Sequence, residues 1–196
     1  MAITVLGTRR SHFTRKVRLL LDHLQIAYRL EDVGDVSRSD HEAFNKHPIL
    51  TVPIALFDED VVYDSDEIAR TLVARYNPGD DFCVNPQSTE ILNMRTVLNA
   101  AMAAEVRLIV ASRLGQETEN TAFFDKSKIV IHRSMEWCEK RSDLLDVTLP
   151  KYLDFHFKSF WDHVHYFKLV DSRWPKLEEI SARLEESPVF QLSSIR

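Results

Sequence analysis

The start of the chain alternates between strand-like and helical patterns, and this order limits the fold more than any other feature. Residues 3–6 form a short β-branched run closed by Gly7, which predicts a buried strand. From residue 13 to residue 24, apolar side chains recur at helical spacing and predict a helix with one apolar stripe. Residues 27–30 predict a second strand. The order strand, helix, strand favours a parallel pair with a right-handed crossover.

The other face of the predicted first helix is polar. Arg15, Lys16, Arg18 and Asp22 fill it. This helix is therefore predicted to be amphipathic.

The pattern of short strands continues after a polar stretch at residues 32–40. We expect a short helix over residues 39–46, ended before a proline that disfavours helical backbone in the residue it follows. Residues 51–57 and 61–63 predict a hairpin around the acidic turn at residues 58–60.

A second helix is predicted to begin after Asp64. This residue is a good N-cap, and Glu67 stands where a capping box places its acidic partner. Ile68, Leu72 and Tyr76 then line one face of the predicted helix.

The two halves of the chain differ in character. A turn-rich segment ends the alternation, and later residues show only helical runs, at 88–114, 121–141, 149–169 and from Trp174-Pro175 onward. We therefore expect an α/β domain over residues 1–77, a linker over 78–87 and an all-helical domain over 88–196.

Composition excludes several classes of function. The formal net charge is -5 with no long block of one sign, which argues against nucleic acid as a partner because phosphate binding needs a basic face. No apolar run reaches a membrane-spanning length, and the first residues run straight into a strand rather than a secretory signal. Cys83 and Cys138 show no metal-type spacing and are expected to be inert. A reducing cytoplasm is the expected location.

Three ordered motifs carry a resemblance to a known family. Residues 11–18 read Ser-His-Phe-Thr-Arg-Lys-Val-Arg, residues 47–53 read His-Pro-Ile-Leu-Thr-Val-Pro, and residues 63–68 read Tyr-Asp-Ser-Asp-Glu-Ile. Each resembles a segment of glutathione transferases: a Ser-Pro-Tyr or Ser-Pro-Phe start with a basic pair and Val-Arg, an Asn-Pro-x-Gly-Lys-Val-Pro loop, and a Glu-Ser-x-x-Ile segment. Their order and spacing are compatible with that family.

The resemblance implies both a fold and a function. The fold is a thioredoxin-like α/β domain of order βαβαββα, followed by an all-α domain. The function is a cytoplasmic glutathione S-transferase of the serine type, acting in detoxification. Glutathione would be the co-substrate, a small hydrophobic electrophile the second substrate, and the chain a homodimer packed through the Ala-rich residues 99–104. No metal is implied.

Ser11 has two interpretations. It precedes the predicted first helix, so its hydroxyl suits a structural N-cap. A helix N-terminus also favours an anion, and a thiol placed there has its pKa lowered from about 8.5 toward about 7 or below. The resemblance gives Ser11 this catalytic role. Thr8, at the position of the tyrosine that other transferases use, and Thr14 are the alternative hydroxyl donors.

The resemblance also implies the glutathione anchors. Val52 would precede a cis Pro53 and pair its backbone with the tripeptide as an added strand does; the alternative is an edge strand that simply ends at proline. Asp64 and Ser65 would hold the γ-glutamyl end at a helix N-terminus; the alternative is capping alone.

Departures from the family pattern leave two points open. The family's loop Gly and Lys are replaced, and Lys46, Arg38 or Arg15 would have to supply the missing cation. In the second half, Thr148 stands at the start of a Ser/Thr-x-x-Asp pattern whose acid is Lys151 here. Either Asp146 caps that helix, or the local structure differs.

A metal site at His156, His163 and His165 is disfavoured, because their spacing on one helix does not bring the ligands together. The aromatic residues of the same segment are expected in the core and in the wall of an electrophile pocket. Two alternatives to conjugation remain. One is a non-catalytic, protein-binding scaffold similar to the stringent starvation proteins; the other is a glutathione-dependent isomerase or dehalogenase.

Overall fold

Four strands form one mixed sheet in the order β2-β1-β3-β4. The computed structural model describes residues 3–38, 40–86, 88–171 and 173–195. The strands are β1 (Ile3–Gly7), β2 (Tyr28–Asp32), β3 (Ile54–Phe57) and β4 (Asp60–Tyr63). As predicted, β1 and β2 are parallel, and β3 and β4 form an antiparallel hairpin. The strand expected over residues 51–57 begins later than predicted, at Ile54, because Pro53 has no N–H to donate to a ladder.

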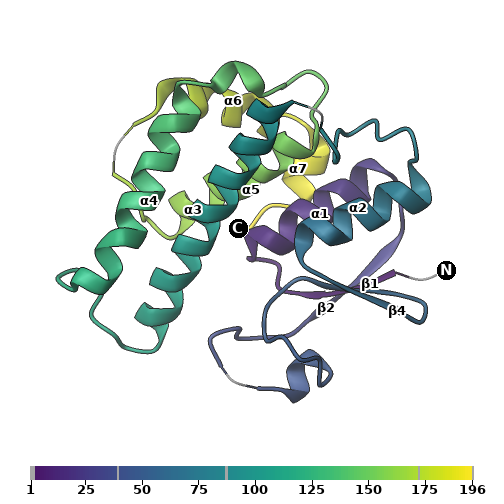
Figure 1. Cartoon of the computed structure of the whole chain (residues 1–196), viewed down its shortest axis with the longest axis horizontal. Coiled ribbons are helices and arrows are strands. Elements are labelled where there is room, and N and C mark those ends of the chain that lie inside the picture. Colours follow the sequence, from purple (N-terminus) through teal and green to yellow (C-terminus); the bar gives the residue numbers. More distant parts are fainter. Residues whose placement is uncertain (1–2, 39, 87, 172, 196) are drawn as a thin grey trace.

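Two helices cover one face of this sheet, α1 (His12–His23) and α2 (Ser65–Tyr76) (Figure 1). The opposite face packs against the long loop between β2 and β3, through a small core that includes Leu6, Val33 and Phe44. Within that loop the predicted helix is reduced to a single 3-10 turn, η1 (Glu42–Phe44). Ser39, the expected first residue of that helix, lies outside the described residues.

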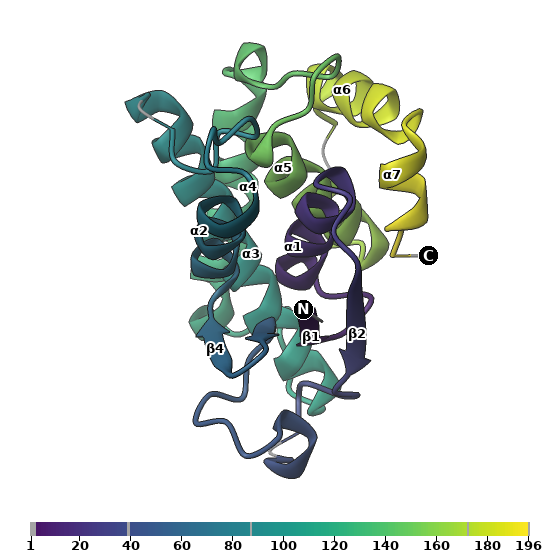
Figure 2. The same ribbon diagram turned by 90° about the vertical axis from the view of Figure 1, so that its right-hand side faces the viewer.

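The rest of the chain is helical and lies beside the sheet half in Figure 1, whereas Figure 2 looks from the sheet side, with the sheet half in front. Its elements are α3 (Thr89–Arg113), α4 (Ala122–Glu139), the 3-10 turn η2 (Ser142–Leu144), α5 (Tyr152–Tyr166), α6 (Pro175–Glu185) and the short α7 (Pro188–Leu192). Helix α1 packs directly against α5, so the two halves share one large apolar core. The fold expected from sequence, an α/β first part followed by an all-α part, is confirmed.

The start of α5 corrects the interpretation of residues 148–151. The helix begins three residues later than the Thr148 pattern implies, with Lys151 as its N-cap residue. The carboxylate of Asp154 accepts hydrogen bonds from the backbone N–H of Lys151 at 2.6 Å and of Asp146 at 2.8 Å. Asp154 therefore supplies the acid that appeared to be missing, and Asp146 caps only the preceding turn by accepting from Thr148 N.

The polar face of α1 is not a solvent face. Arg15 and Lys16 are fully buried, because this face lies against α5 and α2 rather than water. The Arg15 guanidinium pairs with Asp162 on α5 at 2.5 Å. Its Nε atom also donates to Ser193 at 3.3 Å, beyond α7. Arg15, which belongs to the predicted polar face of α1, therefore joins the two halves of the chain through these contacts.

Lys16 is the centre of a second buried group. Its ammonium donates to Asp66 at 3.0 Å, to Asn99 at 3.0 Å and to His156 Nε2 at 2.6 Å. His156 donates from Nδ1 to the Tyr152 carbonyl, which leaves Nε2 as an acceptor. Burial lowers the pKa of His156 to about 4 and that of Lys16 to about 8, so the imidazole is neutral and the ammonium charged near pH 7.

Asp66 balances that charge. Burial opposes its ionisation, but the charges of Lys16 and Arg95 and the hydrogen bond that its carboxylate accepts from Asn99 hold the pKa of its carboxyl well below the ordinary range. Arg95 lies 3.3 Å from the carboxylate and the Tyr152 hydroxyl donates to it at 3.1 Å. This cluster of Lys16, Asp66, Asn99, His156 and Arg95 joins α1, α2, α3 and α5, and we call it the buried ionic cluster.

Two remaining expectations concern the membrane and the cysteines. Among the described residues, no helix combines the length and the apolar character that a membrane span needs. Both cysteines are free. Burial raises the pKa of Cys138 to about 12, which keeps that thiol protonated and unreactive.

We predict that Asp66→Asn lowers the free energy of unfolding by about 3 kcal/mol at pH 7, because it leaves a buried ammonium without its counter-charge. The folded-state pKa of Asp66 is depressed, so its stabilisation is present above the unfolded-state pKa of about 3.9 and is lost as pH falls below it. The difference between wild type and variant should therefore shrink between about pH 4 and pH 2.

Urea unfolding at several pH values measures this difference. Asp60→Asn is the matched control, because Asp60 forms an exposed pair with Arg75. That control should lose at most about 1 kcal/mol. Equal losses in the two variants would show that the buried ionic cluster has no special weight.

Candidate active site

The three motif segments meet at one edge of the sheet. In the register of the strands, Leu6 lies opposite Ile54 and Ile54 lies opposite Tyr63. The chain therefore leaves β1, enters β3 and leaves β4 at the same edge. Ser11, the Val52-Pro53 pair and the Asp64-Ser65 pair all lie on these segments, so the topology gathers residues that are far apart in sequence.

A cavity of about 300 Å³ opens beside this edge. Ser11 and Val52 line it from the sheet half, and Val106 and Val110 of α3 line it from the helical half. Its wall is largely apolar and includes Phe13, Leu50 and Phe167. The cavity thus has one wall built from predicted glutathione-site residues and one built from the helical half, as expected for a two-substrate site.

Ser11 is the N-cap of α1, and its side chain lies in the cavity wall. Its Oγ accepts a hydrogen bond from Thr14 N at 3.2 Å, and its own N–H donates to Thr8 Oγ1 at 3.1 Å. The serine oxygen is used as an acceptor by the helix, so its hydroxyl proton remains available to donate. Capping and anion binding are therefore compatible at this residue rather than alternatives.

The two threonine alternatives differ in position. Thr8 lies in the cavity wall. Thr14 is buried against Gly7, where an added Cβ would lie 2.5 Å from the threonine methyl group. A side chain at residue 7 would therefore displace Thr14. Because Thr14 is outside the cavity wall, it is in a poor position to act as a hydroxyl donor.

The peptide bond between Val52 and Pro53 is cis, as the resemblance implied. Among the hydrogen bonds of the described residues, none uses the Val52 N–H or carbonyl. Val52 lies in the cavity wall just before β3 begins. An extended peptide in the cavity would find a free donor and a free acceptor there.

Asp64 and Ser65 lie at the start of α2, outside the wall of this cavity. The Asp64 carboxylate accepts from Asp66 N at 2.8 Å and from Glu67 N at 3.3 Å, which makes it the predicted N-cap. The capping box is only half formed, because the Glu67 carboxylate pairs with Arg70 instead. Ser65 is buried, and its carbonyl accepts from the Tyr152 hydroxyl at 3.1 Å.

The candidate cations occupy different surroundings. Arg15 is enclosed and paired with Asp162, so it is not a ligand-binding cation. Arg38 and Lys46 are exposed, each lies near an acid of its own loop, and neither is in the cavity wall. Arg113, at the end of α3, does line the cavity and was not predicted.

A buried cluster behind the cavity was also missed. His12 and His163 lie in the cavity wall with their rings stacked at 4.0 Å between centroids. Glu105 of α3 hydrogen-bonds His163 Nδ1 and lies 3.8 Å from His12 Nε2. The other two histidines of the predicted group lie elsewhere: His156 in the buried ionic cluster, and His165 bonded to its own helix. The structure thus separates the three histidines, and His163 meets partners on two other helices.

Burial sets the protonation of this cluster. It raises the pKa of Glu105 well above its ordinary value and lowers that of His12 well below. Burial, together with the charge of Arg113, lowers the pKa of His163 to about 3. Burial therefore favours the neutral form of all three groups, and a neutral Glu105 carboxyl would donate to His163 Nδ1.

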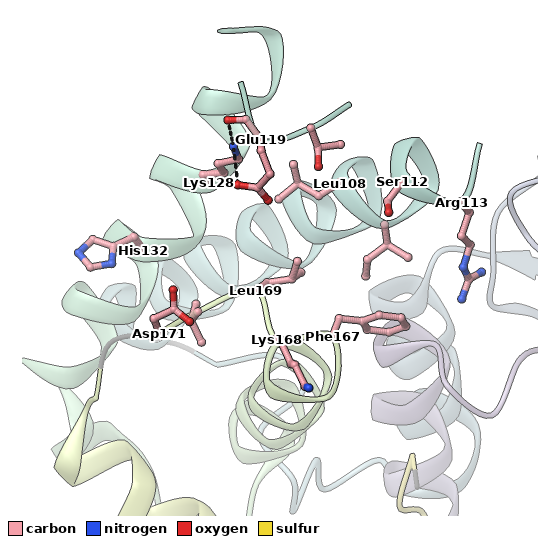
Figure 3. A pocket seen from close by; sticks show the side chains of 13 residues that line it. Leu108, Ser112, Arg113, Glu119, Lys128, His132, Phe167, Lys168, Leu169 and Asp171 are labelled. Atoms are coloured by element: carbon pink, nitrogen blue, oxygen red, sulfur yellow. Dashed lines mark hydrogen bonds and ion pairs between the residues drawn. The ribbon is translucent and has the colours of Figure 1, made fainter. Parts of the chain in front are cut away.

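A second hollow, of about 590 Å³, lies between α3, α4 and the segment after α5 (Figure 3). It shares Arg113 and Phe167 with the first cavity. The Lys128 ammonium in its wall is neutralised by Glu119, as the dashed lines show. This hollow contains none of the predicted site residues, so the smaller cavity is the better candidate site.

Comparison with known proteins agrees with this geometry. Residues 5–80 match the family described as the glutathione S-transferase N-terminal domain. This part of the chain therefore belongs to the glutathione S-transferase N-terminal domain family. The matched span contains Ser11, Val52, Pro53, Asp64 and Ser65. No curated protein matches the sequence.

Solved glutathione S-transferases share the fold over nearly the whole chain. One from Methylobacterium radiotolerans, in complex with glutathione sulfonate, has 19% identity and a TM-score of 0.82, covering 98% of this chain and 94% of its own. Glutathione transferase E6 from Drosophila melanogaster has 24% identity and a TM-score of 0.77, with 98% and 90% covered. One from Methylobacillus flagellatus with glutathione bound has 16% identity and a TM-score of 0.77, with 98% of each chain covered. At such identities the likeness shows the fold alone.

The largely apolar wall of this cavity is expected to bind apolar molecules. We predict that Ala103→Phe, which places a ring in the cavity wall, weakens the binding of the fluorescent dye anilinonaphthalene sulfonate about tenfold, or about 1.4 kcal/mol. Ala74→Phe is the matched control, because Ala74 is exposed on α2 and lies outside the cavity wall. An equal effect in the control would show that the dye binds elsewhere.

Proposed function

We propose that this chain is a glutathione transferase that activates the glutathione thiol for attack on a small apolar electrophile. The observation that carries the proposal is the position of Ser11. Its hydroxyl oxygen caps α1 as an acceptor, which leaves the hydroxyl proton to donate, and Ser11 lines a cavity of suitable size. The solved relatives that bind glutathione or glutathione sulfonate have the same fold, which supports the choice of ligand.

In this proposal Ser11 stabilises the thiolate. The N-terminus of α1 presents backbone N–H groups and the positive end of the helix dipole to an anion. The Ser11 hydroxyl adds a charge-assisted hydrogen bond. Together these favour the ionised sulfur, and the thiolate is the nucleophilic form. The chain thereby raises the reactive fraction of glutathione near neutral pH.

The proposed glutathione-binding residues lie along the same edge of the sheet. The free N–H and carbonyl of Val52 would pair with the cysteinyl unit, with Pro53 setting the shape of the loop. Asp64 and Ser65 at the N-terminus of α2 would hold the γ-glutamyl end. Lys46 and Arg38 remain the proposed cations for the tripeptide's carboxylates, and they would have to exchange their present partners, Glu42 and Asp35, for the ligand. A homodimer in the cytoplasm, with a role in detoxification, is part of the same proposal.

Ser11→Ala tests the central step. We expect about a 10²-fold loss of kcat/KM for glutathione with chlorodinitrobenzene, because one oxyanion-type donor is removed. The free energy of unfolding should fall by only about 1 kcal/mol, the usual cost of one N-cap. Ser11→Thr keeps both the cap and the hydroxyl, and should retain most of the activity.

Steady-state kinetics and thermal unfolding measure the two effects separately. If the folded wild-type protein neither binds glutathione nor conjugates it, the proposal is wrong. If Ser11→Ala and Ser11→Thr lose activity equally, the hydroxyl is not the group that matters.

A further inference from the structure

The paired side chains of Glu105 and His163 form an acid–base unit at the edge of the candidate cavity. Glu105 lies on α3 and is fully buried, whereas His163 lies on α5 and belongs to the cavity wall. Their hydrogen bond joins a carboxyl oxygen to Nδ1. The hydrogen bonds of the described residues use the His163 side chain only at this nitrogen, so Nε2 is the side-chain atom left for a ligand.

We propose that His163 is a second catalytic residue, a general acid toward electrophiles whose oxygen becomes an anion when sulfur attacks, and that Glu105 positions and reprotonates it. This inference rests on the proposed function. It assigns a class of second substrate, α,β-unsaturated carbonyl compounds, to the same cavity. The apolar walls at Phe13, Val106 and Phe167 would hold the carbon skeleton of such a compound.

The surroundings of the pair favour one arrangement of its protons. A neutral imidazole that accepts at Nδ1 carries its proton on Nε2. Neutral Glu105 is consistent with its other oxygen, Oε1, which is buried and has no hydrogen-bond partner among the described residues. His12 stacks on His163 and is itself fixed, because its Nε2 donates to the Met102 carbonyl at 3.1 Å. The nearby cations Arg113 and Arg15 further disfavour an imidazolium.

The proposed step conserves atoms, electrons and protons. The thiolate sulfur forms a bond to the β-carbon, and the electron pair of the carbon–carbon double bond moves to make an enolate. His163 donates its Nε2 proton to the enolate oxygen while the Glu105 proton moves to Nδ1. The pair resets when the Nδ1 proton returns to Glu105 and Nε2 takes up a proton from solvent in the cavity, which equals the proton that the glutathione thiol released. The enol product then becomes the ketone, and no oxidant or metal is consumed.

The same three side chains also resemble a zinc ligand set of two histidines and one glutamate. The stacking of the rings argues against this use. Imidazole nitrogens bind a metal in the plane of the ring, and two stacked rings with centroids 4.0 Å apart and planes 25° from parallel do not direct their nitrogens toward one ion. The acid–base interpretation uses the three side chains in the positions that the structure gives them.

A comparison of two electrophiles tests the proposal. Chlorodinitrobenzene expels chloride and needs no proton, whereas benzylideneacetone forms an enolate. We expect His163→Phe to lower kcat/KM for benzylideneacetone about 10²-fold and that for chlorodinitrobenzene only a few-fold, in line with the usual contribution of general acid catalysis. Glu105→Gln keeps the size of the side chain but cannot pass the proton, so it should lower kcat for benzylideneacetone about tenfold with little change in KM.

The controls separate the possible failures. His165→Phe alters an exposed histidine of the same helix and should leave both reactions as in the wild type. Equal losses on both electrophiles in either variant, or no loss on benzylideneacetone, would overturn the proposal and leave the transferase function standing. Wild-type protein that conjugates neither compound would overturn both. Stoichiometric zinc uptake in equilibrium dialysis, abolished by His163→Phe, would reassign the cluster to a metal.

Discussion

The ion pair between Lys16 and Asp66 is the contact on which the rest of the structure depends. It joins α1 to α2, and through Asn99, Arg95 and His156 it extends to α3 and α5. A buried charge costs several kcal/mol unless its partners are in place. The buried ionic cluster therefore permits only a narrow range of positions for α1 between the sheet and the helical half.

The position of α1 also determines the geometry of the candidate site. Ser11 caps that helix, and Arg15, one turn further on, is tied to α5 through Asp162. The sheet supplies Val52 at the same edge, and α3 and α5 supply the opposite wall. Because the two walls come from different halves of the chain, the cavity exists only while the interface between them is intact. Substitutions in the buried ionic cluster are thus expected to affect the site from a distance.

Local periodicity was enough to predict most of the elements. The crossover of β1, α1 and β2 and the helices of the second half follow from apolar spacing, and the hairpin of β3 and β4 from turn residues. The burial of Lys16 and Arg15 could not be predicted in this way, because their partners lie 50 and 147 residues further along the chain. The start of α5 was misplaced because Thr148 looked like an N-cap, whereas the acid that closes the turn is Asp154.

The residues of the candidate site fall into the same two groups: those that local motifs predict, and those whose partners lie far away in the sequence. Ser11 and Val52 were predicted because they belong to contiguous motifs, and the structure places both in the cavity wall. His163 was noted only as one of three histidines on one helix. Its partner Glu105 lies 58 residues away on another helix, and no spacing rule relates the two. The sequence therefore predicts the wall that would hold glutathione better than the wall that would select the second substrate.

The central claim is that a glutathione sulfur is held as a thiolate beside Ser11. The most direct test is a pH titration of the ultraviolet thiolate absorbance of glutathione bound to the wild-type protein. We expect an apparent thiol pKa of about 7 or below, against about 8.5 for a free thiol, and a return toward the free value in Ser11→Ala. A bound thiol that titrates as it does in water would contradict the central claim.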